Sequence, residues 1–184
     1  MIAVCVFCGS GAGRDPQYIK LAELVGREIA RRGWRLVYGG GGIGMMGAVA
    51  QGCLDAGGLV TGIIPTFLMS KERAHPGVQE MREVGSMLER KRVMFELTDA
   101  FITLPGGLGT LDELLEALTA RQLRLHDGPC ALLNVNGFFD GLLEVLDRAV
   151  ADEYLRQQSR DFLLTETDPN ALFDRIEAAL AERP

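Results

Sequence analysis

The chain has 184 residues and a mass of 20.0 kDa; 47% of its residues are hydrophobic and 24% are charged, which is typical of one soluble folded domain and excludes a disordered chain. The net charge of −6 argues against a nucleic-acid-binding protein, which would carry a basic face. No apolar stretch reaches the roughly 18 residues that span a bilayer, and the N-terminus lacks the charged region of a signal peptide. We therefore expect a cytoplasmic protein with neither a membrane nor a nucleic-acid partner.

Strand and helix patterns alternate along the chain. An apolar strand over 2–9 is followed by a helix over 15–33, with Asp15 as its expected N-cap and Gly33 at its end. The later elements are strands over 34–40, 59–65, 99–105, 129–135 and 161–166, an extended piece near 78–85, and helices over 44–58, 86–98, 110–126, 138–155 and 168–183.

Apolar strands that do not alternate, each followed by a helix, indicate a parallel sheet covered on both faces. No internal repeat, linker or low-complexity segment interrupts the pattern. The sequence predicts a single domain over 1–184, an α/β, doubly wound, Rossmann-like fold with a mainly parallel sheet and helices on both faces.

The four cysteines are expected to be buried free thiols. Cys5 and Cys8 form a CxxC pair, which raises a redox or zinc interpretation. Residues three apart on a strand point to opposite faces, however, and no second pair of ligands accompanies these two. We therefore expect no metal site.

Glycine-rich turns follow three of the predicted strands, in "CGSGAG", "YGGGGIGMMG" and "LPGGLGT". In doubly wound sheets, ligands bind at the carboxyl ends of the strands. One such cluster is explained by a tight turn, but three at one edge favour a ligand that carries a phosphate or a nucleotide. In the first two clusters the candidate binding residues are Gly9, Ser10, Gly41 and Gly42.

The segment from Gly42 to Gly47 satisfies GxGxxG, the fingerprint of dinucleotide enzymes. That fingerprint normally follows the first strand of its unit and needs an acid at the end of the next strand. Here the next strand, "LVTGIIP", ends without Asp or Glu, and the chain lacks GxxxxGK followed by Ser or Thr. The sequence therefore argues against a dinucleotide enzyme and against a P-loop ATPase.

The third cluster, "PGGLGTLDE", opens a helix and predicts an anion site. Gly106, Gly107 and Gly109 let the backbone approach a phosphate, next to Leu108, and Thr110 is expected to cap the helix and add a hydroxyl. The free N–H groups and the positive end of the helix dipole favour a negative ligand.

Glu113 lies about one helical turn beyond that loop, where it can face the sugar attached to the phosphate. A carboxylate there stabilises the oxocarbenium-like cation that forms when an N-glycosidic bond breaks, and it orients water. Its neighbour Asp112 is expected only to suit the helix dipole.

The stretch "MLERKRVMFELTDAFITLPGGLGTLDELLEALTARQLRLHDGPCALLNVNGFF" resembles the Lonely Guy (LOG) family of cytokinin riboside 5′-monophosphate phosphoribohydrolases. The family's paired signature, an "RK" helix followed by "PGGxGTxxE", stands here as Arg90-Lys91 and Pro105 to Glu113. The resemblance implies hydrolysis of N6-substituted adenosine 5′-monophosphates to the free base and ribose 5-phosphate, without metal or other cofactor. It also implies a homodimer.

Matched residue by residue, the resemblance makes Arg90 and Glu113 the catalytic pair. It makes Glu72, Lys91 and the run from Gly107 to Thr110 substrate contacts. Some members were once labelled lysine decarboxylases, but that reaction usually needs pyridoxal phosphate, and no lysine here has a recognisable setting for it.

Two other functions stay open at this point: a broader nucleosidase that acts on plain AMP, and a non-catalytic nucleotide-binding module. Retention of both Arg90 and Glu113 argues against the module. Ala120 and Arg121 stand where many members have other residues, and we expect them near a subunit contact or the base pocket. The helix around them carries leucines over more of its circumference than one buried stripe requires, which supports a dimer.

Overall fold

The computed structural model describes residues 1–69 and 74–183, so the predicted substrate residue Glu72 lies outside the described residues. Within them, one parallel sheet has the strand order β4-β3-β2-β1-β5-β6-β7. The strands are β1 (Ala3–Phe7), β2 (Arg35–Tyr38), β3 (Leu59–Pro65), β4 (Glu80–Val84), β5 (Ala100–Thr103), β6 (Cys130–Leu133) and β7 (Leu163–Glu166).

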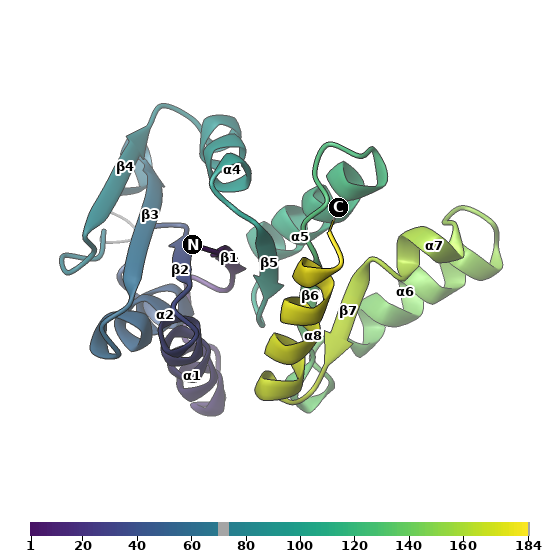
Figure 1. Ribbon diagram of the computed structural model, residues 1–184, viewed down its shortest axis with the longest axis horizontal. Helices are drawn as coiled ribbons and strands as arrows, with labels where there is room; N and C mark the ends of the chain where they lie inside the picture. The colour runs from purple at the N-terminus through teal and green to yellow at the C-terminus, as the bar shows by residue number, and fades with distance from the viewer. Residues whose placement is uncertain (70–73, 184) are drawn as a thin grey trace.

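Helices cover both faces of this sheet (Figure 1). They are α1 (Gln17–Arg31), α2 (Gly44–Asp55), α4 (Met87–Glu96), α5 (Leu108–Gln122), α6 (Asp140–Ala151), α7 (Gln157–Arg160) and α8 (Pro169–Ala181), with short 3-10 turns at Thr66–Leu68 and Val135–Gly137. Helices α1, α2 and α8 pack on one face, and α4 and α5 pack on the other. The predicted doubly wound α/β fold is confirmed.

Each face of the sheet has its own apolar core. One core lies under α1, α2 and α8 and includes Val4, Val6 and Cys8. The other lies under α4 and α5 and includes Cys5 and Phe7. The alternation expected for a strand therefore separates the two cysteines of the CxxC pair. All four cysteines are buried and free, as predicted.

The strand order reverses between β1 and β5. From β1 the chain moves through α1 and α2 toward β3 on one face, whereas from β5 it moves through α5 toward β6 on the other. Right-handed crossovers require this exchange of faces when the direction of winding changes. The loops after β1 and β5 consequently diverge and leave a crevice, which is where ligands bind in sheets of this type.

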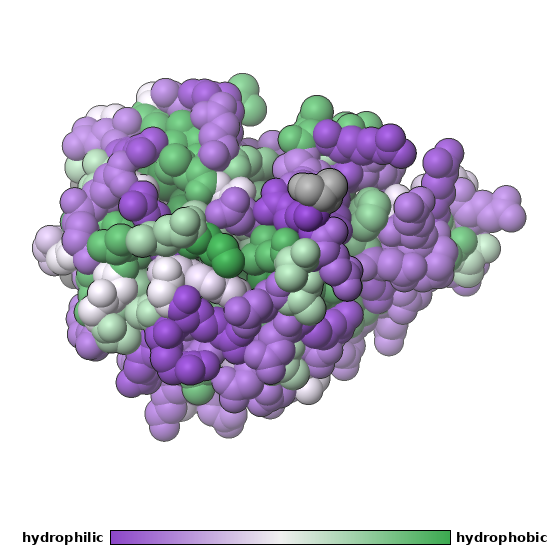
Figure 2. Space-filling view, viewed as in Figure 1, coloured by the Kyte–Doolittle hydropathy of each residue, from purple (hydrophilic) through white to green (hydrophobic). Residues whose placement is uncertain are grey.

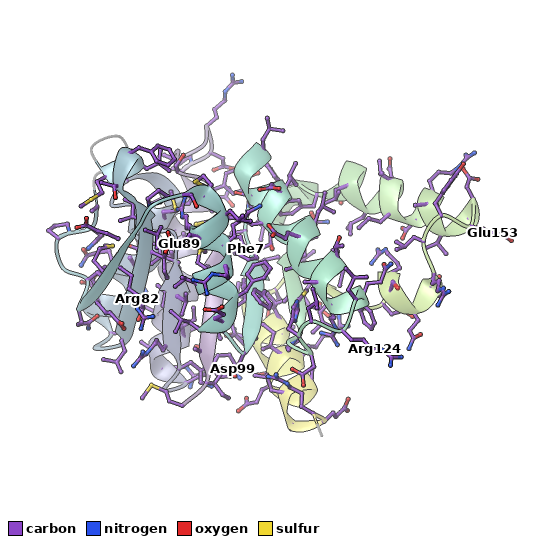
Figure 3. All side chains as sticks on the ribbon, turned by 90° about the horizontal axis from the view of Figure 1, so that it is seen from above. Phe7, Arg82, Glu89, Asp99, Arg124 and Glu153 are labelled. Carbon is purple, nitrogen blue, oxygen red and sulfur yellow. The ribbon has the colours of Figure 1, made fainter. Side chains whose placement is uncertain are left out.

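The helix predicted over 138–155 is shorter in the structure, and a short helix that was not predicted lies beyond its expected end. Helix α6 ends at Ala151, Glu153 takes a left-handed backbone conformation (φ 63°), and the short helix α7 follows. Helices α6 and α7 extend beyond β7 at the right of Figure 1, and the labelled Glu153 lies at their far end in Figure 3. Among the described residues, no helix is long and apolar enough to cross a membrane.

Candidate active site

A cavity of about 550 Å³ lies between the loops that follow β1 and β5, at the reversal of strand order. The predicted binding residues Gly9, Gly106 and Gly107 line it. The full lining is Gly9, Gly11, Gly13, Arg14, Asp15, Tyr18, Met45, Pro105, Gly106, Gly107 and Phe138. Because the two loops come from adjacent strands, a ligand held here touches both.

The N-terminus of α5 opens beside this cavity without a side-chain cap. Its N-cap is Gly107, in an extended conformation (φ −96°, ψ −153°), and within residues 1–69 and 74–183 no side-chain cap is formed. By contrast, Ser86 caps α4 and Asp168 caps α8 through their side-chain oxygens. The first N–H groups of a helix have no partner within the helix, so those of α5 remain available to an anion.

Thr110 does not cap α5, which corrects the prediction from the sequence. The helix begins two residues earlier than predicted, at Leu108, so Thr110 is its third residue and is only 3% exposed. Leu108 is 87% exposed. A methyl group added at Gly107 or Gly109 would come within 4 Å of no other part of the described chain outside this turn, so the backbone of the turn is open to a ligand.

The second glycine cluster packs loops together. Met45 and Met46, at the start of α2, donate their N–H groups to the carbonyls of Gly11 and Gly9 (3.3 Å each). A side chain at Gly44 would overlap the backbone of Ser10, so glycine is required for this contact. The N-terminus of α2 is therefore already occupied by the loop after β1.

Of the predicted binding residues that the structure describes, only Gly9, Gly106 and Gly107 line the cavity at the reversal of strand order. The others do not: Ser10, Gly41, Gly42, Arg90, Lys91, Leu108, Gly109 and Thr110. Gly41 is buried and forms a bridge with Ala74. Their role in binding stays a prediction.

Arg90 is buried, with only 4% of its surface exposed. It projects from α4 toward the end of β2, where its Nη2 donates to the carbonyl of Gly39 at 2.6 Å. A side chain at Gly39 would overlap the guanidinium, so this glycine makes room for the arginine. The sequence alone placed Arg90 in a basic run, "ERKR", typical of an exposed helix face; the structure places it in the core at the carboxyl edge.

Glu113 lies half-buried on the second turn of α5 and approaches the same edge from the other side. Burial raises the pKa of the Cys8 thiol, the carboxylate of Glu113 raises this pKa further, and the guanidinium of Arg90 opposes both effects. The same two charges act on the pKa of Cys5. The charges of Arg90 and Glu113 therefore both act on the thiols of Cys5 and Cys8. That the two residues form a catalytic pair stays a prediction.

Lys91 forms ion pairs with two other acids of α5. Its Nζ lies 3.1 Å from the carboxylate of Asp112 and 2.5 Å from that of Glu116, and these partners raise the pKa of its ammonium, Glu116 contributing most. Asp112 therefore does more than suit the helix dipole, contrary to the expectation from the sequence: it joins α5 to α4.

An apolar groove of about 700 Å³ separates α4 from α5. Leu88, Leu123 and Leu125 line it and are 73%, 63% and 75% exposed. Ala120 also lines it, whereas Arg121 donates to the carbonyl of Gly128 and lies over the ring of Phe162. In Figure 2, apolar surface borders the notch between α4 and the end of α5 at the top of the view.

Sequence reasoning missed Arg14, Tyr18 and Phe138 as cavity residues. Arg14 follows directly on the first glycine cluster, and Phe138 follows the strand next to β5, so both come soon after a strand's carboxyl end. Their position just after a strand was the feature of the sequence that could have identified them as cavity residues. Among the described residues, no group of three or more His, Cys, Asp or Glu side chains is placed to hold a metal ion.

Together, the fold and the site define a doubly wound α/β protein with a glycine-rich turn beside a cavity at its switch point, the place where Rossmann-like proteins bind their ligands. Solved structures share this fold. The Moco carrier protein from Chlamydomonas reinhardtii superposes with a TM-score of 0.75 at 20% identity, over 99% of both chains. The molybdenum cofactor binding protein from Rippkaea orientalis has a TM-score of 0.71 at 26% identity, over 96% of both chains.

The sequence comparisons are more specific. A family model described as "Possible lysine decarboxylase" matches residues 46–176. Cytokinin riboside 5′-monophosphate phosphoribohydrolase LOG3 from Arabidopsis thaliana is 44% identical over 174 residues, which are 95% of this chain and 81% of the relative. The enzyme LOG from Oryza sativa subsp. japonica is 43% identical over 179 residues, 97% of this chain and 74% of the relative. The chain belongs to the LOG family, as its resemblance predicted.

Proposed function

We propose that the protein hydrolyses the N-glycosidic bond of N6-substituted adenosine 5′-monophosphates and releases the free base and ribose 5-phosphate. The observation that supports this proposal is the placement of two charged side chains: Arg90 is buried at the end of β2, and Glu113 lies one turn beyond the N-terminus of α5, which has no side-chain cap. The names of the relatives support it, since both are phosphoribohydrolases of cytokinin riboside 5′-monophosphates.

In this mechanism the glycine turn from Gly106 to Thr110 holds the 5′-phosphate, because its backbone N–H groups and helix dipole favour an anion. Binding of this remote group positions the bond that reacts. Lys91 and Glu72 stay predicted substrate contacts, and the present position of Lys91 would require it to exchange its partners on α5 for the ligand.

Glu113 stabilises the positive charge at the anomeric carbon as the bond to the base nitrogen breaks. It also orients the water whose oxygen forms the new bond to that carbon. Arg90 is a poor proton donor because a guanidinium stays charged in proteins. We assign it to the ribose or phosphate oxygens and to the alignment of Glu113.

The alternatives can be weighed against the site. A carboxylate close to a phosphate weakens binding, so Glu113 is a poor choice for a protein that only carries a nucleotide. The two molybdenum-cofactor proteins share the fold, which by itself does not set the function. Hydrolysis of plain AMP differs from the proposal only in the base, and the substrate panel described below separates the two.

We further infer a homodimer in the cytoplasm. The groove between α4 and α5 exposes large leucines in one contiguous surface, and such patches mark interaction sites. A second copy of the chain is its proposed occupant, which agrees with the family resemblance. The four buried free thiols fit a reducing compartment.

A substrate panel tests the proposed activity. The enzyme is incubated with AMP, an N6-alkyl AMP, other nucleoside 5′-monophosphates and the matching nucleosides, and free base is measured by chromatography. We expect the N6-alkyl AMP to be the best substrate and its nucleoside to have a kcat/KM at least about 100-fold lower, because the phosphate supplies binding energy. Equal cleavage of nucleoside and monophosphate would contradict the role of the glycine turn; preference for plain AMP would favour the broader nucleosidase.

A further inference from the structure

We propose that Arg14 binds the 5′-phosphate of the substrate from the side of the cavity opposite α5. This inference rests on the proposed function, since it concerns the same ligand. It adds an arginine side chain to the phosphate site predicted from the sequence, which consisted of the glycines of the turn and Thr110.

The position of Arg14 is set by aromatic packing. It lines the cavity together with Gly106 and Gly107, directly after Gly13, which has a left-handed backbone (φ 71°). A side-chain carbon at Gly13 would lie 3.1 Å from the ring of Tyr18, so the turn fits closely against that ring. Tyr18 in turn meets Phe138 edge to face, with ring centroids 5.9 Å apart. The turn that carries Arg14 therefore packs against the ring of Tyr18, and this ring packs against Phe138.

Arg14 is also the cation available to a ligand in this cavity. The other charged lining residue, Asp15, accepts a hydrogen bond from the backbone N–H of Gln17 at 2.9 Å; the N-cap of α1 is Pro16 and not Asp15, which the sequence had predicted. Within residues 1–69 and 74–183, Arg14 forms no ion pair with a carboxylate.

The two other cations proposed to contact the substrate already have protein partners in this structure. Arg90 is buried and donates to Gly39, and Lys91 lies between two carboxylates of α5. A phosphate monoester carries a charge of about −1.5 to −2 at neutral pH, whereas a helix N-terminus offers about half a positive charge. A guanidinium balances the remainder, and its planar fork matches two phosphate oxygens.

This arrangement separates binding from chemistry. The phosphate lies between Arg14 and the first turn of α5, and the glycosidic bond lies toward Arg90 and Glu113. Arg14 is therefore a binding residue and touches no reacting atom. Its loss is expected to weaken the binding of every ligand that carries the 5′-phosphate and to leave nucleosides unaffected.

Three variants test this inference: Arg14→Gln, Arg14→Lys and, as a control, Arg27→Gln. Arg27 is an exposed arginine on α1 that pairs with Glu23. For Arg14→Gln we expect KM for the 5′-monophosphate to rise about 10- to 100-fold, as for loss of a charged hydrogen bond, with kcat changed less than about threefold. Arg14→Lys keeps the charge without the fork and should lie between Arg14→Gln and the wild type; Arg27→Gln should match the wild type.

Calorimetric binding of ribose 5-phosphate to the same variants separates this inference from the proposed function, because it needs no turnover. Weaker binding in Arg14→Gln than in wild type and Arg27→Gln supports the inference even if no substrate is cleaved. Equal binding in wild type and Arg14→Gln overturns it, as does a failure of the wild type to bind ribose 5-phosphate. Melting curves for each variant check that the fold is intact.

Discussion

Gly106 and Gly109 stand three residues apart at the start of α5, but an added methyl group would meet different surroundings at each. At Gly106 it would overlap the hydroxyl of Thr110 and lie 2.9 Å from the backbone nitrogen of Gly9. At Gly109 it would meet nothing within 4 Å. Gly106 is thus required by the packing of the two loops, whereas the protein itself places no steric demand on Gly109.

A pair of alanine substitutions separates these two requirements. Gly109→Ala should keep or raise the thermal midpoint, since alanine is favoured over glycine in a helix by up to about 1 kcal/mol. It should nevertheless raise KM for 5′-monophosphates about tenfold or more, because the methyl group enters the space that the phosphate needs. Gly106→Ala should instead lower the stability by about 1–3 kcal/mol through overpacking.

Melting curves and steady-state kinetics on both variants measure these effects. A Gly109→Ala enzyme with unchanged KM would show that the phosphate binds away from this turn.

The role of Arg90 was predictable only in part. The resemblance to the LOG family identified it, but its helix pattern indicated an exposed basic face. Burial of a guanidinium depends on partners that are distant in sequence, here the carbonyl of Gly39, 51 residues away. The prediction that Thr110 caps α5 was wrong because the position of the cap depends on where the helix begins. The glycines at 107 and 109 suggested a loop, but α5 already begins at Leu108.

The elements themselves were more predictable than their ends. Apolar strands and amphipathic helices follow from local patterns, and every predicted strand and helix has a counterpart in the structure. The break between α6 and α7 occurs without glycine or proline, at Glu153, so the sequence carries no local signal for it. The ion pairs between Lys91 and α5 were equally unpredictable from the sequence, because they join two helices that meet only in the tertiary structure.

Helix α1 is joined to α8 by a charged network centred on Glu28. This side chain is 8% exposed and accepts hydrogen bonds from Arg31 (2.7 Å) and Arg32 (2.6 Å). Arg32 also pairs with Asp174 and Glu177 of α8. The two hydrogen bonds from Arg31, followed by the one from Arg32, hold the pKa of Glu28 below its ordinary value of 4.5, against the opposing effect of burial.

This lowered pKa predicts a pH-dependent contribution to stability. Because the ionised form is favoured in the folded protein, the contribution is complete above about pH 4.5 and is lost as the pH falls through the lower folded pKa. Glu28→Gln should therefore lower the free energy of unfolding by about 1–3 kcal/mol at pH 7. The difference from wild type should shrink below pH 4.5.

Urea denaturation at pH 7, 5, 4 and 3.5 measures this difference. Glu23→Gln, on the same helix but exposed, is the control and should cost less than about 0.5 kcal/mol. A penalty for Glu28→Gln that stays constant down to pH 3.5 would contradict the assignment.

At the scale of the whole molecule, the exposed groove between α4 and α5 predicts association through this face. Leu88→Glu places a charge on a 73% exposed position of the groove, so it should leave folding intact and convert a dimer into a monomer. Val145→Glu, at a 65% exposed position on α6 outside the groove, is the matched control. Light scattering at micromolar concentration gives the mass of each.

Two outcomes would contradict this prediction. A monomeric wild type would disprove the dimer, and a dimeric Leu88→Glu variant would place its interface elsewhere.

The central claim is that Glu113 provides the charge that stabilises the transition state beside a phosphate held by α5. Glu113→Gln keeps the shape of the side chain and removes its charge, whereas Asp112→Asn changes the neighbouring acid, which is exposed and pairs with Lys91. The direct measurement is turnover of an N6-alkyl AMP together with calorimetric affinity for AMP in both variants. We predict that Glu113→Gln lowers kcat by about 10²- to 10³-fold and binds AMP as tightly as the wild type or more tightly, while Asp112→Asn changes each by less than about threefold. Near-wild-type turnover in Glu113→Gln would contradict the mechanism.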